Sequence, residues 1–100
     1  MERIQSTLTL LTIAVDTLES CGILDSEFTT ASVTKHGISL MLDKSPKAYD
    51  FINKLTAKLD LVIEDTHAHR NETRGIDFFT TKFETPAGRS VDICIVRDDK

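Results

Sequence analysis

The stretch from Ser45 to Leu59 constrains the fold most, because it is a well-marked helix set between segments patterned as strands. Ser45 is suited to cap a helix, and Pro46 then occupies the first helical position, where its missing N–H costs nothing. The apolar positions recur at helical spacing, with either Phe51 or Ile52 inward: Ala48, Phe51 or Ile52, Leu55 and Leu59. A helix between β segments predicts a mixed α and β domain.

Two strands are predicted before this helix, over residues 28–33 and 37–43. The turn between them, Thr34 to Gly37, ends in a glycine that we expect to adopt the positive φ of a tight hairpin. In the second strand Ile38, Leu40 and Leu42 alternate with more polar residues, so this side should face the core. His36 falls in the turn, where an exposed, solvated role is the simplest interpretation.

Three more strands are predicted after the helix, over residues 61–65, 75–85 and 89–97, with a turn at residues 85–88. Phe79 and Phe83 share one face of the terminal hairpin. We interpret them as packing residues, because a nucleic-acid stacking platform would need more flanking cations. Phe78 and Val96 lie on the other face, so this hairpin is a candidate subunit or partner interface.

A first helix is predicted over residues 4–21, although its threonines lower its intrinsic helicity. Gly22 and Ile23 fit a Schellman stop. Leu10 and Ile13 fall outside the main apolar stripe, which leaves either a deeply seated helix or one that also forms a homodimer or partner interface. The stripe expected to face the core is Ile4, Leu8, Leu11, Val15 and Leu18.

The chain of 100 residues is the size of one domain. Its elements in order, α-β-β-α-β-β-β, predict an α+β two-layer sandwich in residues 1–100. In this fold a mainly antiparallel sheet of about five strands packs one face against two helices.

The net charge of −4 disfavours a general phosphate-backbone binder, so direct nucleic-acid binding is not expected. Charge is nevertheless segregated, since the second helix carries Lys47, Lys54 and Lys58 near one another on its outer side. The simpler interpretation is a solvated face. The alternative interpretation is a surface that docks onto an acidic protein or a phosphate.

The polar connection from Thr66 to Gly75 concentrates most of the versatile side chains, and we interpret it as an exposed binding loop. His67 and His69 would point the same way on an extended segment, close enough to share a metal if a third ligand converged. The candidates for that ligand are Asp65, Glu72, Asp92 and Cys94, but a lone His-x-His pair without a further ligand motif is not specific, so no metal or cofactor is predicted. The candidate binding residues here are His67, His69, Arg70, Asn71, Glu72 and Arg74.

Cys21 and Cys94 lie far apart in a chain without a visible secretory signal or membrane span, so we expect a cytoplasmic protein with reduced thiols. No complete catalytic signature is present. One alternative is a small metal-dependent or cysteine-dependent enzyme centred on His67, His69 and Cys94. Against it, Cys94 sits in an apolar strand typical of an inert, packed thiol.

The favoured interpretation is a non-enzymatic protein-binding or regulatory module that acts by stoichiometric contacts. We expect it to form a homodimer through the first helix or the terminal hairpin. In size, acidity and lack of motifs the chain resembles accessory proteins of phages and mobile elements. This resemblance implies an inhibitor of a host nucleic-acid enzyme or defence system. It rests on composition and points to no particular family.

Overall fold

The computed structural model describes residues 2–23, 28–34 and 36–98. They form an α+β fold with the expected element order, two helices and five strands, so the predicted fold class is confirmed. No helix in these ranges is long and apolar enough to cross a membrane. The elements are α1 (Glu2–Ser20), β1 (Phe28–Val33), β2 (Gly37–Asp43), α2 (Pro46–Leu59), β3 (Val62–Asn71), β4 (Ile76–Glu84) and β5 (Ser90–Asp98).

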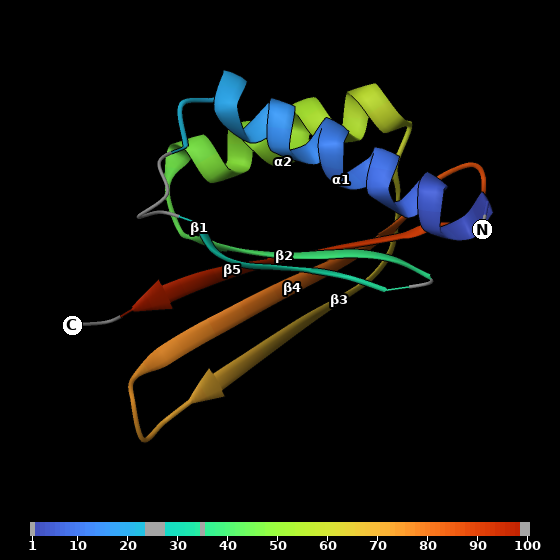
Figure 1. Ribbon diagram of the computed structural model, residues 1–100. Helices are drawn as coiled ribbons and strands as arrows, with labels where there is room; N and C mark the ends of the chain where they lie inside the picture. The colour runs from blue at the N-terminus through green and yellow to red at the C-terminus, as the bar shows by residue number, and fades with distance from the viewer. Residues whose placement is uncertain (1, 24–27, 35, 99–100) are drawn as a thin grey trace.

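The five strands form one sheet in the order β1-β2-β5-β4-β3, and both helices lie over the same face of it (Figure 1). All neighbouring pairs are antiparallel except β2 and β5, which run parallel. A parallel pair cannot be joined by a tight turn. Here α2, β3 and β4 all intervene along the chain between the two central strands, and β5 returns to the middle of the sheet.

The core lies between the two central strands and the helices. In the β2–β5 register Ile38 lies beside Val91 and Leu40 beside Ile93, and all four side chains are buried. The predicted inward face of β2 is therefore confirmed. The helix α2 buries Ala48, Phe51 and Leu55 against the sheet. Phe51 and Ile52 were the alternatives for the inward position, and Phe51 is the one that lies in the core.

The start of α2 follows the sequence prediction. The Ser45 hydroxyl accepts a hydrogen bond from the backbone N–H of Ala48 at 3.2 Å, and Pro46 occupies the first turn. This cap satisfies one of the N–H groups that a helix N-terminus leaves unpaired. At the other end Asp60 adopts the left-handed conformation with φ of 51°, and its N–H bonds to the carbonyl of Thr56.

The end of α1 is also as predicted. Gly22 has a φ of 72°, and its N–H donates to the carbonyl of Glu19. The N–H of Ile23 donates to the carbonyl of Leu18. These two bonds define a Schellman motif.

The face that α1 turns inward differs from the predicted stripe, which was wrong for two of its members. Leu8 is 49% exposed and Val15 is 38% exposed, whereas Leu10 is buried and Leu11 is only partly so. The Ile4 side chain lies outside the described part of the chain. Among the side chains described from residue 7 onward, those that α1 buries are Thr7, Leu10, Ala14, Thr17 and Leu18.

The buried face of α1 includes threonines because a helical hydroxyl can bond to its own backbone. The Thr17 hydroxyl donates to the carbonyl of Ile13 at 2.7 Å, so the buried hydroxyl has a hydrogen-bond partner. Thr7, Ala14 and Thr17 are small, and they let the helix approach its neighbours closely. Counting only large apolar residues therefore selected the wrong face. Leu8 and Val15 are exposed large apolar side chains among those described on α1, and the proposed dimer or partner interface on this helix stays a prediction.

The β1–β2 turn corrects a second prediction. The Thr34 N–H bonds to the Gly37 carbonyl at 2.9 Å, so the hairpin is present. Gly37, however, does not have a positive φ, unlike Gly22, Gly75 and Gly88. A Cβ at Gly37 would lie 1.8 Å from the backbone oxygen of Ser90 on β5. Close backbone approach between two strands, and not turn geometry, is what requires glycine here.

Candidate functional site

The part of the sheet that carries the candidate site is its β3–β4 end, which the helices do not cover. Figure 1 shows the β3–β4 hairpin running out beyond α1 and α2. Side chains on the helix-facing side of β4 change accordingly along the strand. Phe83 is 2% exposed and packs in the core, whereas Phe79, on the same face, is 48% exposed. The prediction that Phe79 and Phe83 share a face is confirmed, but only Phe83 lies in the core.

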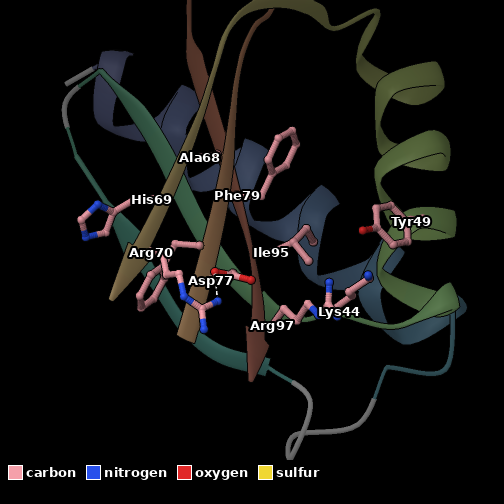
Figure 2. A pocket seen from close by; sticks show the side chains of 10 residues that line it. Lys44, Tyr49, Ala68, His69, Arg70, Asp77, Phe79, Ile95 and Arg97 are labelled. Carbon is pink, nitrogen blue, oxygen red and sulfur yellow. Dashed lines mark hydrogen bonds and ion pairs between the residues drawn. The ribbon is translucent and has the colours of Figure 1, made fainter. Parts of the chain in front are cut away.

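A pocket of about 380 Å³ lies at this uncovered end, between α2 and the outer strands. Figure 2 shows Tyr49 reaching toward it from α2, with Phe79 and Ile95 on the sheet opposite. The volume lies within the range that binds small ligands or a few side chains of a partner. Its lining residues are Lys44, Tyr49, Ala68, His69, Arg70, Asp77, Phe78, Phe79, Ile95 and Arg97.

Two half-exposed aromatic rings give the pocket its apolar surface. Tyr49, 46% exposed, lies one residue after buried Ala48 and two before buried Phe51, so the helix turns its ring outward from the core. Phe79 is held by the β4–β5 register opposite Ile95, which is 4% exposed. Aromatic rings that combine a large contact area with few rotatable bonds are the usual anchors of binding surfaces.

The charged residues of the pocket are mainly cationic. Lys44, Arg70 and Arg97 contribute positive charge, against the single carboxylate of Asp77. Arg70 donates from Nη1 to Oδ1 of Asp77 at 2.6 Å, across the β3–β4 register in which the two residues are partners. A cationic pocket on a chain of net charge −4 attracts an anionic group locally.

The predicted binding loop is in fact mostly strand. β3 continues from Val62 to Asn71, so His67, His69, Arg70 and Asn71 lie in an extended segment paired with β4. The connection is a short turn, which leaves Glu72 and Arg74 exposed at the hairpin tip. There the Asn71 side chain accepts a hydrogen bond from the N–H of Arg74 at 3.3 Å. Polar composition suggested a loop, but an edge strand whose side chains are exposed on both faces has the same composition.

Of the predicted residues, Arg70 extends its side chain to the pocket, whereas His69 borders the pocket with its ring on the opposite face of the sheet. His69 also stacks on Phe78, with ring centroids 6.2 Å apart. Sequence reasoning did not select Lys44, Tyr49 or Arg97. Their signal is weak, because they come from three segments that only the parallel β2–β5 pairing brings together.

The predicted side-by-side orientation of the histidines is confirmed, and Asp65 shares their face. Nε2 of His67 lies 2.9 Å from Oδ2 of Asp65. Cys94 also lies on this face, but Thr80 of β4 stands between it and His67. Two strand spacings separate those residues by about 10 Å. Among the described residues no three metal-ligating side chains converge.

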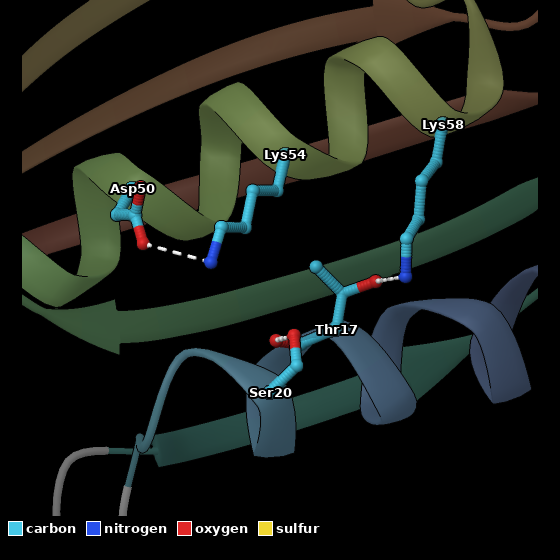
Figure 3. A network of polar contacts seen from close by, with 5 residues as sticks. All are labelled: Thr17, Ser20, Asp50, Lys54 and Lys58. Atoms are coloured by element: carbon cyan, nitrogen blue, oxygen red, sulfur yellow. Dashed lines mark hydrogen bonds and ion pairs between the residues drawn. The ribbon is translucent and has the colours of Figure 1, made fainter.

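The three lysines of α2 all make contacts within the protein, and Figure 3 shows those of Lys54 and Lys58. Lys47 donates to the carbonyl of Gly22 at 3.0 Å, at the end of α1 where the helix dipole favours a cation. Lys58 donates to the Thr17 hydroxyl at 3.3 Å, and Lys54 pairs with Asp50 at 3.3 Å. Two of the three therefore tie α2 to α1, a role that composition alone did not indicate.

One partly buried carboxylate, Asp92, lies on the sheet face opposite the helices. Oδ1 of Asp92 is buried and has no hydrogen-bond partner in the described part of the chain. Burial raises the pKa of this carboxyl above its ordinary value of 3.8. Lys82 beside it lowers the pKa by a smaller amount, and Glu64 adds to the increase. The charged form is thus less favourable in the folded state than in the unfolded state.

Asp92→Asn should therefore raise the free energy of unfolding at pH 7. In the wild type the folded state holds this proton more tightly, so stability falls as pH rises from about 4 through the raised pKa and then levels off. The gain of the variant over the wild type should be larger at pH 7 than at pH 4, as measured by urea denaturation at both values. An equal gain at both pH values would show that burial of the charge has no net cost.

The sequence matches no protein-family model, and no curated protein is significantly similar to it. Function must therefore be argued from the geometry of this site.

Proposed function

We propose that this chain is a protein-binding module that holds an acidic segment of its target, together with one apolar side chain, in the pocket between α2 and β4. The observation that carries the proposal is the pairing of half-exposed Tyr49 and Phe79 with the cations Lys44 and Arg97 in one hollow. Aromatic and arginine side chains in a pocket are the typical energetic centres of protein interfaces.

The pocket's chemistry selects the class of target. Its apolar floor of Phe79 and Ile95 suits an aliphatic or aromatic side chain, and its cations suit neighbouring carboxylates. The exposed surface also continues along the same edge of the sheet, where Val62 and Ile63 are 67% and 61% exposed. A surface of this length fits a polypeptide better than a small molecule.

In this proposal the chain acts by stoichiometric contact, without chemistry of its own. Its small size and acidity agree with the regulatory proteins and inhibitors of phages and mobile elements, and the target would be an enzyme or defence protein of the host. Arg70 then belongs to the rim of the contact surface, and His69 borders it on the outer side. The turn residues Glu72 and Arg74 extend that rim at the hairpin tip.

The test is a quantitative pull-down from nuclease-treated host lysate, with the wild type and a Tyr49→Ala/Phe79→Ala double variant as baits. We expect a protein captured in stoichiometric amount by the wild type, and its capture to fall about tenfold or more with the double variant. Both side chains are half exposed, so the variant should keep its fold.

Val33→Ala is the matched control, because Val33 is 41% exposed and does not line the pocket. It should capture the target as the wild type does. A Lys44→Glu/Arg97→Glu variant should weaken capture most at low salt, since it reverses the charge that attracts an acidic partner. Undiminished capture by the Tyr49→Ala/Phe79→Ala variant would show that the pocket is not the contact surface.

A further inference from the structure

The sheet has a second face, which no described helix or strand covers. Both helices lie over the other face, where β2, β5 and β4 bury the core (Figure 1). A sheet with one solvated face normally alternates along each strand, with polar residues outward. On these three strands the alternation fails, because apolar residues also occupy outward positions. They form what we call the open-face patch: Met41, Ile76, Phe78, Cys94 and Val96.

The strand register makes this patch continuous. Met41 of β2 lies beside Cys94 of β5, and Val96 of β5 lies beside Phe78 of β4. Cys94 is only 8% exposed although no helix covers it, so its neighbours on the sheet shield it. Met41, Phe78 and Val96 are half-buried. Apolar side chains that join across three neighbouring strands differ from the single ones scattered over an ordinary surface, and they indicate a contact site.

The width of the patch matches one helix. Neighbouring strands lie about 5 Å apart, so β2, β5 and β4 together span about 10 Å. An α-helix with its side chains is about 10–12 Å wide. The other face of the same sheet already packs in this way, since α2 buries Phe51 and Leu55 against it. A helix with one apolar side therefore fits the patch.

One end of the open face is acidic. Asp92 of β5 lies beside Lys82 of β4, and Glu84 follows two positions after Lys82 on the same side of that strand. Glu64, at the bulge of β3, lies close enough for its charge to act on Asp92. Among the described residues neither Glu64 nor Glu84 forms an ion pair. Three carboxylates, which we call the acidic end, are thus set against one lysine.

The chain does not itself neutralise the acidic end. Asp65 faces the same side, but its carboxylate is engaged by the His67 ring at 2.9 Å and by the Thr66 N–H at 2.8 Å. Oδ1 of Asp92, in contrast, is buried without a hydrogen-bond partner in the described part of the chain. A cation brought to this end by a partner would stabilise the charge of Asp92, which burial otherwise disfavours.

Charge decides between the possible occupants of the open face. A second copy of the chain would offer the same carboxylates and the same single lysine, so it would not supply the missing positive charge. A nucleic acid would be repelled by the acidic end. A helix that carries lysine or arginine at one end of an apolar stripe supplies both the apolar surface and the cations.

We propose that the open face docks an amphipathic helix of a partner protein. The apolar stripe of this helix lies on the open-face patch, and its lysine or arginine residues lie over the acidic end. The pocket that holds Tyr49 and Phe79 is on the other side of the sheet, and Met41, Cys94 and Val96 do not line it. This proposal therefore does not depend on the proposed function.

Fluorescence anisotropy with a labelled synthetic helix tests the charge match. The probe is an amphipathic peptide of about four helical turns, with leucines on one side and lysines at one end. The wild type should bind it with a Kd of about 0.1 mM or lower. A peptide with glutamate in place of each lysine should bind about tenfold or more weakly. A wild type that binds neither peptide, or both equally, would overturn the proposal.

Glu64→Gln/Asp92→Asn should weaken binding of the lysine peptide about fivefold or more, while removal of the buried charge leaves the fold at least as stable. The matched control is Asp16→Asn/Glu19→Gln, which removes two exposed carboxylates from α1, on the other side of the sheet. It should bind as the wild type does. Equal weakening by the two variants would show that only the net charge matters, and would overturn the proposal.

Met41→Ser/Val96→Ser tests the open-face patch. It should raise the Kd of the lysine peptide about fivefold or more, whereas Leu8→Ser/Val15→Ser, which alters exposed apolar residues of α1, should not. Unchanged binding by Met41→Ser/Val96→Ser would overturn the proposal. So would a wild type that dimerises in sedimentation equilibrium and becomes monomeric in this variant, because a second copy would then cover the face.

Discussion

Gly37→Ala should destabilise the protein by about 3 kcal/mol or more, although it adds only a methyl group. The added Cβ would lie 1.8 Å from the oxygen, 2.7 Å from the carbon and 2.8 Å from the nitrogen of the Ser90 backbone. Ser90 cannot move aside by a rotamer change, because the contact is with main chain. The two central strands must separate locally, and they carry the core residues Ile38 and Val91 on the next register pair.

The expected loss is large relative to the whole stability of a domain of this size, which is about 5–15 kcal/mol. Urea denaturation followed by circular dichroism should show a markedly lower midpoint, or a protein already partly unfolded in buffer. Gly75→Ala is the matched control, because Gly75 has a φ of 68° and open space around its Cβ position. It should cost about 1 kcal/mol, from left-handed strain alone.

Which of the two variants loses more stability shows whether turn geometry or close strand approach is what requires glycine. If turn geometry were what mattered, Gly75→Ala would be the more damaging change and Gly37→Ala nearly neutral, since Gly37 has no positive φ. If close strand approach matters, the order reverses. Equal stability of Gly37→Ala and the wild type would mean that β2 and β5 do not lie as close as the structure has them.

Local patterns were enough to predict most of the elements. The boundaries of β1 and β2 and the start of α2 follow from alternation, turn residues and the Ser45-Pro46 cap, all of which act within a few residues. The terminal turn at Thr85 to Gly88 was predicted for the same reason, and Gly88 has the positive φ that such a turn favours. These features depend on short-range sterics and hydrogen bonding, which a sequence displays directly.

The strand order could not be predicted in this way. Parallel pairing of β2 with β5 joins residues about fifty positions apart, and no local signal encodes it. The face of α1 was misjudged for a related reason. Which side of a helix is buried depends on what it packs against, and buried Thr7 and Thr17 carry no apolar signal.

The candidate site was only half foreseen for the same reason. His69 and Arg70 drew attention because polar, versatile side chains cluster in that segment. Tyr49 and Lys44 become site residues only once α2 and β2 are placed beside the β3–β4 hairpin. A pocket assembled from distant segments is a product of topology, and its residues look ordinary in sequence.

Phe51→Ala should destabilise the protein by about 3–5 kcal/mol. Phe51 is 0% exposed and is the largest of the fully buried side chains, set between the helices and the central strands. Its removal loses the transfer free energy of the ring and leaves a cavity that close-packed neighbours fill only in part. For a domain of this size we expect the thermal midpoint to fall by about 15 °C or more, as measured by differential scanning calorimetry.

Tyr49→Ala gives the comparison that makes this result specific, because it removes an aromatic ring of similar size two positions away on the same helix. Tyr49 is 46% exposed, so its truncation should cost about 1 kcal/mol or less. The two variants should then separate stability from binding: Phe51→Ala unfolds easily, while Tyr49→Ala stays folded and loses affinity for the target. Similar losses of stability in both would mean that α2 is rotated about its axis, with Tyr49 sharing the core and the pocket closed.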